Sequence, residues 1–399
     1  MKILHINNFY HKGGGTEIYI DRISNELQRL GNEVLILYGV PPLSGAEVIG
    51  YKGIFVPDIH KSENKSVLSH VKELVEKEGV DIIYLHNIFN SALIEGIGKV
   101  RPLLKLVHDH DFYCPGGLQY FPEIKKTCTL KYHPLRCFLL AYLTHCASRH
   151  PFRLWRRIYQ CGNILAQKKT FDGFVVFSHA MKKCLERNCI EGERISVIHH
   201  FTKPLSSIRK NKNPSMLLYV GRICPEKGVE PLLDVVAGLR SNYRLVIAGD
   251  GYYLSQVKKR AVRLGISHRI EFKGWLSETE LNDYYSRAAV LIFPSLWSEP
   301  FGMAGIEAMA HGTPVVAFNT GAVSEWLIDK ETGFLVKPGD VLEMRERIEL
   351  LLRNEKLAHD MGITGRELVE KHFSVEKHIK DLLIATSEAI KRYHVRTGN

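Results

Sequence analysis

Short runs of Val, Ile and Leu alternate with helix-like stretches from one end of the chain to the other. The runs show little alternation of apolar and polar positions, which is typical of parallel strands covered by helices on both faces. Helical periodicity lies between them, for example over 17–30, 67–78 and 230–239. The predicted strands are 2–6, 33–38, 81–86, 103–108, 173–178, 195–198, 216–220, 243–248, 269–273, 289–294, 314–318 and 333–336.

This alternation predicts an α/β protein that contains two sets of doubly wound, Rossmann-like structure. The two sets are separated by a polar, Pro-punctuated linker over 201–214, which includes Thr202-Lys203-Pro204 and the stretch from Arg209 to Pro214. We therefore expect two domains that face each other across a cleft. Open α/β sheets bind ligands outside the carboxyl ends of their strands, so the cleft is the expected place of a site.

Residues 112–170 depart from the pattern, because they contain no clear strand and indicate an insertion with irregular and helical parts. An apolar run over 137–146 is followed by Arg149, Arg153, Trp155, Arg156 and Arg157. A basic, aromatic-bearing amphipathic stretch can lie in a membrane interface, or it can pack as a helix on its own domain. The pattern alone leaves both interpretations open.

The charge of the chain is concentrated in one part. The net charge is +11, and residues 101–200 hold 16 Lys and Arg against 7 Asp and Glu. Such a surface favours an anionic partner, although a solvated surface rich in basic residues also fits. No helix-turn-helix, zinc-finger or RNP-type motif accompanies the charge, so we expect no nucleic-acid partner.

The chain carries no export or membrane-spanning signal. No apolar run approaches the roughly 20 residues that span a bilayer, and the N-terminus has the pattern of a buried strand rather than of a signal peptide. The sequence thus predicts a cytoplasmic protein, with peripheral contact to the inner face of a membrane as an addition. Its eight cysteines are then expected to be reduced thiols.

Two glutamates eight positions apart bracket a predicted helix start. Pro300 and Gly302 interrupt regular structure after the strand at 289–294, and a helix is predicted from 301 or 302 to 311–312. Glu299 then lies in the loop before the helix, and Glu307 lies about two turns along it. Free N–H groups at a helix start suit phosphate or sugar oxygens, and carboxylates accept hydrogen bonds from sugar hydroxyls.

A second motif, residues 220–228, follows the strand at 216–220. Gly221 allows the backbone to approach a ligand closely, and Arg222 and Lys227 supply two cations that suit a diphosphate. Charge-assisted hydrogen bonds of this kind contribute roughly 1.5–3 kcal/mol each. The segment lacks the Gly-x-x-x-x-Gly-Lys-Ser/Thr spacing of the NTPase phosphate loop. Two surface cations after a strand remain the alternative.

These motifs resemble those of the family 4 retaining glycosyltransferases of GT-B fold. The resemblance covers nearly the whole chain and is strongest over 216–340. It rests on the spacing of Glu299 and Glu307, on Gly221-Arg222-x4-Lys227-Gly228, on Ala248-Gly249-Asp250-Gly251, and on the segments 313–316, 321–325 and 332–336. In the first half it rests on Gly13-Gly14-Gly15-Thr16-Glu17, His110-Asp111 and Cys114-Pro115. The chain departs from the family pattern at Gly321–Glu325 and at His199-His200-Phe201, where the family has an Asn-Gly pair.

The resemblance implies a donor site for a nucleoside-diphosphate sugar. Arg222 and Lys227 would hold the diphosphate and stabilise it as it leaves. Glu307 would accept hydrogen bonds from the ribose hydroxyls. Glu299 would bind hydroxyls of the transferred sugar, near the backbone N–H groups of 301–303 (Phe301, Gly302 and Met303).

The first domain is implied to complete this site. Gly14 and Gly15 would let its backbone approach the phosphates closely. His110 would line the sugar pocket and steady the positive charge that develops at the anomeric carbon. The family is thought to attack from the front face, with the leaving phosphate oxygen taking the acceptor's proton, so no dedicated base is assigned.

From these signals we expect a retaining, metal-independent hexosyltransferase-type enzyme that needs no cofactor and uses a nucleoside-diphosphate sugar, with UDP-sugar favoured by family habit. The expected acceptor is a lipid-linked or cell-surface glycan precursor, and the basic segment 149–169 is the expected contact with an anionic membrane. The alternatives are a nucleotide-sugar epimerase on the same scaffold and a non-catalytic nucleotide-sugar-binding protein. The expected domains are 1–203 on the acceptor side, 204–375 on the donor side, and a C-terminal helix over 376–399 that packs back on the first.

Two clusters in the first half have the composition of metal sites. The segment His108-Asp109-His110-Asp111 resembles a ligand set, but the cations Arg222 and Lys227 already supply the charge that a divalent ion would supply, so we expect no catalytic metal. Cysteines at 114, 128, 137 and 146 could hold a structural zinc ion. They include no Cys-x-x-Cys pair, so buried thiols are the favoured interpretation.

Overall fold

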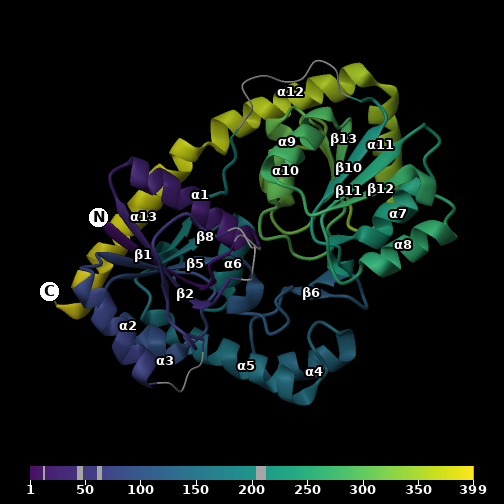
Figure 1. The fold of residues 1–399 in the computed structure, drawn as a ribbon. Coiled ribbons are helices and arrows are strands. Elements are labelled where there is room, and N and C mark those ends of the chain that lie inside the picture. The colour runs from purple at the N-terminus through teal and green to yellow at the C-terminus, as the bar shows by residue number, and fades with distance from the viewer. Residues whose placement is uncertain (12–13, 43–47, 61–64, 204–212, 399) are drawn as a thin grey trace. The chain divides into compact units, whose positions relative to one another are not determined.

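A computed structural model describes residues 1–11, 14–42, 48–60, 65–203 and 213–398 of the chain. Gly13 and most of the predicted linker, residues 204–212, lie outside the described residues. The chain forms two compact units (Figure 1). The first comprises Met1–Gly117, Thr129–Ile198 and His378–Asn399, and the second comprises Leu118–Cys128 and His199–Lys377.

The first unit is built on a parallel sheet whose order is β3-β2-β1-β4-β5-β8-β9. The order reverses between β1 and β4, which makes this the topological switch point where doubly wound sheets bind ligands. Its strands are β1 (Lys2–Phe9), β2 (Glu33–Val40), β3 (Gly53–Phe55), β4 (Ile82–Leu85), β5 (Leu103–Val107), β8 (Gly173–Val176) and β9 (Ile195–Val197).

Helices cover both faces of this sheet. On one face α2 (Lys65–Lys77), α3 (Ser91–Ile97) and α6 (His179–Arg187) share an apolar core with alternate residues of β1, β2 and β4. The other face receives α1 (Gly15–Arg29) and α13 (Val375–Thr397). The C-terminal helix is held there by specific bonds, because Tyr84 bonds to Thr386 at 2.5 Å and Arg396 pairs with the buried Asp172 at 2.9 Å.

The insertion predicted over 112–170 contains two helices and one small hairpin. The helices α4 (Pro134–Thr144) and α5 (Pro151–Ala166) belong to the first unit and pack on each other through Ala141, Leu154 and Ile158. The hairpin of β6 (Tyr120–Phe121) and β7 (Lys126–Thr127) belongs to the second unit, where Tyr120 joins the core. The expectation that this region lacks strands is therefore wrong for the hairpin, whose two-residue strands are too short to leave a pattern.

The second unit repeats the architecture with the parallel order β12-β11-β10-β13-β14-β15. Here the order reverses between β10 and β13. Its strands are β10 (Met216–Val220), β11 (Arg244–Ala248), β12 (Ile270–Gly274), β13 (Val290–Phe293), β14 (Val315–Phe318) and β15 (Gly333–Val336). Its helices are α7 (Val229–Ala237), α8 (Leu254–Arg263), α9 (Glu278–Arg287), α10 (Met303–Ala310), α11 (Val341–Arg353) and α12 (Glu355–His372).

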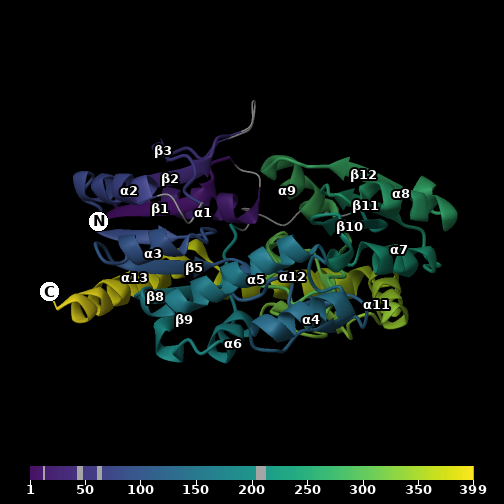
Figure 2. The same ribbon diagram turned by 90° about the horizontal axis from the view of Figure 1, so that it is seen from below.

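All the strands predicted from the apolar runs are present, with bounds that differ by at most three residues. The prediction of α/β architecture with two doubly wound parallel sheets is thus confirmed. Figure 2 shows both sheets with their helices from a second direction. Among the described residues, no helix combines the length and the apolar character needed to cross a membrane.

Candidate active site

The loops that follow β10 and β13 are joined at the switch point of the second sheet. The backbone N–H of Leu296 donates to the carbonyl of Glu226 at 2.9 Å. Gly228 has a φ of +74°, and a Cβ there would lie 1.7 Å from the carbonyl oxygen of Pro294. Only glycine tolerates both this backbone conformation and this approach. The motifs at 220–228 and 298–310 are therefore brought into direct contact.

The contact ends in an ion pair between Lys227 and Glu299. The Lys227 Nζ lies 2.9 Å from each carboxylate oxygen of Glu299, which is almost fully buried. Ser295 Oγ and Trp297 Nε1 donate to Glu299 Oε2 at 2.7 and 2.6 Å. The Lys227 ammonium also lies 4.9 Å from the centre of the Trp297 ring, a cation–π distance.

Opposing effects set the ionisation of Glu299. Burial alone raises the pKa of a carboxyl group, because it removes water from the charged form. The positive charge of Lys227 and the hydrogen bonds from Ser295, Lys227 and Trp297 outweigh burial, so the pKa of Glu299 lies below its ordinary value. The side chain is therefore a carboxylate at neutral pH, and the positive charge of Lys227 stabilises this buried negative charge.

The helix α10 starts one or two residues later than the sequence indicates, with Gly302 as its N-cap at a φ of +104°. Phe301 is buried before it, and its carbonyl accepts a hydrogen bond from the buried Trp326 Nε1 at 2.6 Å. Among the described residues, no carbonyl accepts from the N–H groups of 301–303. Within the described part of the chain, the start of α10 therefore has backbone N–H groups without a carbonyl partner, a few residues after Glu299.

Glu307 occupies the second turn of α10, and its carboxylate accepts from the hydroxyl of the buried Tyr285 at 3.0 Å. This bond comes from α9 and fixes the direction of the side chain. The carbonyl of Glu307 bonds to the ring of His311 at 2.7 Å. Glu307 is half-buried, and the Tyr285 hydroxyl is hydrogen-bonded to its carboxylate.

Arg222 is exposed on the loop after β10, and its side chain makes no hydrogen bond or ion pair within the part of the chain that the structure describes. The backbone around it is tightly constrained. Gly249 after β11 has a φ of +136°, and a Cβ there would meet the carbonyl oxygen of Gly221 at 2.0 Å. The main chain is thus fixed by its neighbours, while the guanidinium group remains available to an anion.

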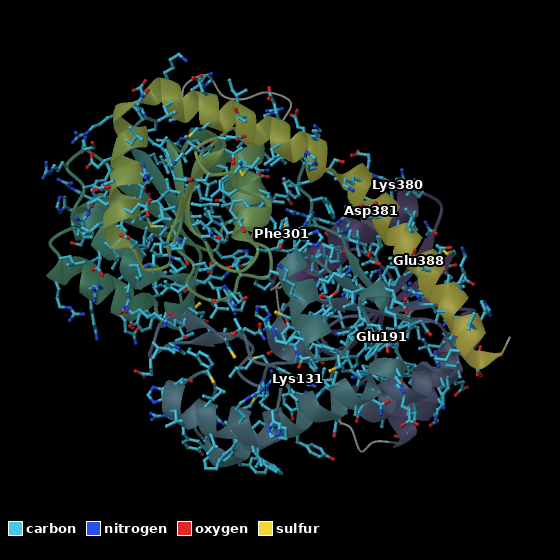
Figure 3. The ribbon with its side chains drawn as sticks, turned by 180° about the vertical axis from the view of Figure 1, so that it is seen from behind. Lys131, Glu191, Phe301, Lys380, Asp381 and Glu388 are labelled. Carbon is cyan, nitrogen blue, oxygen red and sulfur yellow. The ribbon has the colours of Figure 1, made fainter. Side chains whose placement is uncertain are left out.

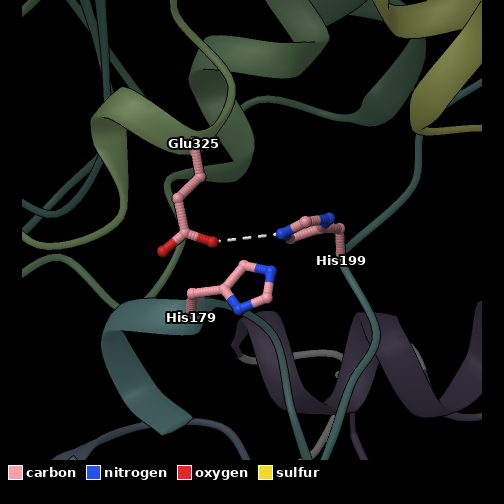
Figure 4. Close-up of side chains that lie close together, drawn as sticks. All are labelled: His179, His199 and Glu325. Carbon is pink, nitrogen blue, oxygen red and sulfur yellow. Dashed lines mark hydrogen bonds and ion pairs between the residues drawn. The ribbon is translucent and has the colours of Figure 1, made fainter. Parts of the chain in front are cut away.

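The two departures from the family pattern in this half lie against each other. His199 Nε2 is 3.1 Å from Glu325 Oε2, and Figure 4 shows this hydrogen bond. The rings of His199 and His200 also lie 5.7 and 5.4 Å from the ring of Phe301. The unusual turn therefore contacts Phe301, which lies just before the N-cap residue of α10.

In the first unit, β1 ends at Phe9, and Gly14 is the N-cap residue of the next helix, α1. A Cβ at Gly14 would meet a carboxylate oxygen of Glu17 at 2.9 Å, whereas the space around Gly15 is open. The amide of Asn7 holds the buried Glu17 at 2.8 Å. The start of α1 therefore combines two glycines, Gly14 and Gly15, with the hydrogen-bonded side chains of Asn7 and Glu17.

In the segment after β5, both aspartates form contacts within the first unit. Asp109 Oδ1 accepts from the N–H of Asp111, and Asp111 pairs with Arg157 at 2.5 Å. His110 is buried, and its Nδ1 lies 2.6 Å from the hydroxyl of Tyr113. The pair with Asp111 also draws Arg157 into the fold, so Arg157 is not part of a free basic surface.

Buried titratable groups that the sequence did not single out lie nearby. His5, His86 and His108 form a row, with ring nitrogens 2.9 Å apart between His5 and His86 and 2.8 Å apart between His86 and His108. Burial is the main cause that lowers the pKa values of all three rings, to about 3 for His5 and His108. Lys105 bonds to the carbonyl of His86, and burial lowers its pKa to about 7. These residues lie in or beside apolar strands, where a local pattern does not distinguish them from core positions.

The four cysteines considered for zinc are half-buried free thiols, not the fully buried ones that the sequence favoured. Burial raises the pKa values of Cys137 and Cys146. Among the described residues, no three thiols converge closely enough to hold one ion.

Sequence reasoning missed the partners that hold the acidic residues. Ser295 and Trp297 lie in the same loop as Glu299, so their position after β13 was a usable signal. Tyr285 is 22 residues from Glu307 and only the tertiary fold joins them. The bond between Lys227 and Glu299, 72 residues apart, is likewise a product of the fold.

Comparison with known proteins assigns the chain to a family. The profile of glycosyl transferases group 1 matches residues 202–368, and that of glycosyltransferase family 4 matches residues 13–204. The uncharacterized glycosyltransferase MJ1178 of Methanocaldococcus jannaschii is 25% identical over 94% of this chain and 95% of its own. The lipopolysaccharide 1,2-N-acetylglucosaminetransferase of Salmonella typhimurium is 32% identical over 43% of this chain and 49% of its own.

The fold is shared with solved structures. HepE of Anabaena, in complex with UDP-glucose, superposes with a TM-score of 0.71 at 17% sequence identity, over 97% of this chain and 99% of that one. Two adjoining family profiles, two doubly wound sheets and the paired-glutamate motif agree with one another. The chain belongs to the family 4 glycosyltransferases and has the GT-B fold.

Proposed function

We propose that this glycosyltransferase moves a sugar from a nucleoside-diphosphate sugar to an acceptor and retains the anomeric configuration. The observation that supports it best is the joined pair of loops at the switch point of the second sheet. There the Lys227–Glu299 ion pair, the exposed Arg222 and the half-buried Glu307 extend from neighbouring elements. Cations for a diphosphate and acceptors for hydroxyls are the groups that such a donor requires.

Lys227 is proposed to orient Glu299, which binds the transferred sugar, and to bind the donor's diphosphate at the same time. An ammonium group has three N–H donors, and Lys227 uses two directions for the oxygens of Glu299. The third, together with the Arg222 guanidinium, would bind the diphosphate. As the bond from the anomeric carbon to the phosphate oxygen breaks, negative charge grows on that oxygen, and fixed cations stabilise it.

The two glutamates are proposed to hold the donor's hydroxyl groups. Glu299 Oε1 accepts only from Lys227 among the described residues, which leaves acceptor capacity for a hydroxyl of the transferred sugar. Glu307 would accept from the ribose hydroxyls, with the N–H groups of 301–303 as further donors. Gly14, Gly15 and His110 are proposed to contact the phosphates and the sugar. The acceptor's proton would go to the leaving phosphate oxygen, and no metal ion or other cofactor is needed.

A uridine diphosphate sugar is the proposed donor, because HepE was solved with UDP-glucose and shares this fold. The proposed acceptor is a lipid-linked or surface glycan precursor, since a partial relative is named for its action on lipopolysaccharide. An acceptor of this kind would place the enzyme in the cytoplasm at the inner face of a membrane. The alternatives of an epimerase and a silent binding protein are less favoured, because the relatives named above are glycosyltransferases.

A thermal-shift panel of nucleoside diphosphates and nucleotide sugars tests the donor, and NMR of the product tests the stereochemistry. We expect UDP to raise the melting temperature, turnover to persist in EDTA, and an α-linked donor to give an α-linked product. Conversion of the nucleotide sugar without any acceptor would identify an epimerase. A product of inverted configuration would overturn the retaining mechanism.

A further inference from the structure

The helices α4 and α5 expose large apolar side chains that their own packing does not require. Their shared seam is already filled by Ala141, Leu154 and Ile158, which are buried. Leu143, Phe152 and Trp155 are 74, 70 and 59% exposed. The full set of exposed apolar residues on the two helices is Leu135, Leu139, Tyr142, Leu143, Phe152, Trp155 and Tyr159.

The spacing of these residues forms a stripe on each helix. On α4 positions 135, 139, 142 and 143 repeat at helical intervals, and on α5 positions 152, 155 and 159 do the same. Each helix is therefore apolar both toward the seam and away from it. Figure 2 looks onto the two helices. We call these two stripes and the basic residues between and beside them the α4–α5 face.

The segment that carries the stripes has charged residues of one sign only. Residues 124–171 contain ten Lys and Arg and no Asp or Glu. Arg153 and Arg156 are exposed on α5 between the aromatic residues, whereas Arg157 is engaged by Asp111. Lys131 precedes α4 (labelled in Figure 3) and, with Lys168 and Lys169, lines a cavity of about 330 Å³.

We propose that the α4–α5 face docks on an anionic lipid bilayer, with the Leu, Phe and Trp side chains in the acyl boundary and the basic residues at the headgroups. Helices that combine Trp, Phe and Leu with arginine lie in the membrane interface in this way. Tyr and Trp favour this depth because one end of each side chain is apolar and the other is polar. The inference deepens the proposed function, because it places the enzyme where a lipid-linked acceptor is found.

Charge complementarity selects the bilayer over a second copy of the chain. In a symmetric dimer through this face, each segment 124–171 would meet another one with the same sign of charge. A bilayer rich in phosphatidylglycerol supplies negative charge along its whole surface and requires no fixed pairing geometry. Docking on such a bilayer therefore removes the apolar side chains from water and gives the basic groups anionic partners.

Flotation with vesicles of phosphatidylcholine alone, or with phosphatidylglycerol added, tests the proposal. We expect the full chain to bind only the anionic vesicles, and 1 M salt to weaken the binding. Leu143→Ser with Phe152→Ser should reduce the partition coefficient about tenfold for each side chain, the change that about 1.4 kcal/mol gives. Arg153→Gln with Arg156→Gln should reduce it roughly fivefold for each, from about 1 kcal/mol per basic group.

Trp155→Ser has a matched control in Trp275→Ser, because Trp275 is 63% exposed on the other unit. The first change should weaken binding and remove the blue shift of tryptophan emission that vesicles cause, and the second should do neither. Equal loss in both variants, or full binding by the Leu143/Phe152 variant, would overturn the proposal. A dimer in gel filtration that this variant disrupts would identify a second copy as the occupant.

The same preparations separate this proposal from the proposed function. The Leu143/Phe152 variant should keep the thermal shift with UDP while it loses vesicle binding. Vesicle binding without a response to any nucleotide would contradict the donor assignment and leave the docking surface standing. A response to UDP without vesicle binding would contradict the docking surface and leave the donor assignment standing.

Discussion

Glu299 keeps its negative charge in a buried place because four hydrogen bonds reach its two oxygens. Lys227 supplies two of them, and Ser295 and Trp297 supply one each. Breaking one half of a buried ion pair is costly, since the other half then lacks its partner in a poorly solvated place. The pair thus connects the stability of the second unit with the chemistry proposed for it.

Glu299→Gln should lower the free energy of unfolding of the second unit by about 1–3 kcal/mol, because Lys227 loses its counter-charge. Urea denaturation measures the change, with the exposed Glu331→Gln as a control that should have no effect. Combined with Lys227→Met, the loss should be smaller than the sum of the single losses. Strict additivity would show that the two side chains do not act as a pair.

Lys105 makes a pH-dependent contribution to the first unit. Burial lowers its pKa to about 7, whereas the unfolded chain has the ordinary value of 10.5. Between these values the unfolded chain holds a proton that the native protein lacks, so stability rises with pH in this window and levels off below it. The slope is at most about 1.4 kcal/mol per pH unit.

Lys105→Met should remove this rise, and the exposed Lys183→Met should leave it unchanged. Urea denaturation of the first unit at pH 7.5 and 9.5 compares the three proteins. A wild-type protein whose stability falls over this interval, or one that matches Lys105→Met, would contradict the assignment of a neutral buried amine.

At the scale of elements, the strands could be predicted because burial on both faces makes each one a continuous apolar run. The exceptions have physical reasons: β3 is a three-residue edge strand with exposed positions, and β6 and β7 have two residues each. The start of α10 could be placed within two residues because Pro300 and Gly302 interrupt the chain. The bonds between elements could not be predicted, since Lys227 and Glu299 meet only after β10 and β13 become neighbours.

The place of α10 depends on how closely Trp326 approaches it. A Cβ at Gly305 would lie 2.1 Å from the Trp326 ring, whereas one at Gly365 on α12 would make ordinary contacts of 3.4 Å or more with Met309. Alanine usually stabilises a helix by about 1 kcal/mol relative to glycine. Gly365→Ala should follow that rule, but Gly305→Ala should destabilise by about 1–3 kcal/mol because the site is already full.

Thermal and urea unfolding of the two alanine variants provide the comparison. Since Gly305 lies between the start of α10 and Glu307, its replacement should also weaken nucleotide binding, whereas Gly365→Ala should not. If Gly305→Ala stabilised the protein, the tight packing against Trp326 would be disproved.

At the scale of the whole molecule, the chain contains the same doubly wound plan twice. Both sheets reverse their strand order at a central pair, and in both the polar loops follow the carboxyl ends of that pair. In the second unit these loops carry the cations and carboxylates of the proposed donor site, and in the first they carry Gly14 and Gly15. The excess of basic residues lies in the insertion that also exposes the apolar stripes of α4 and α5.

Calorimetric titration of UDP into the wild-type protein and into the Arg222→Ala, Lys227→Ala double variant tests the central claim most directly. With both cations in place we expect binding, and without them a loss of about 3–6 kcal/mol, or more than a hundredfold in affinity, since each charge-assisted bond contributes roughly 1.5–3 kcal/mol. Equal affinity in the two proteins would contradict the claim that these cations hold the diphosphate of the donor.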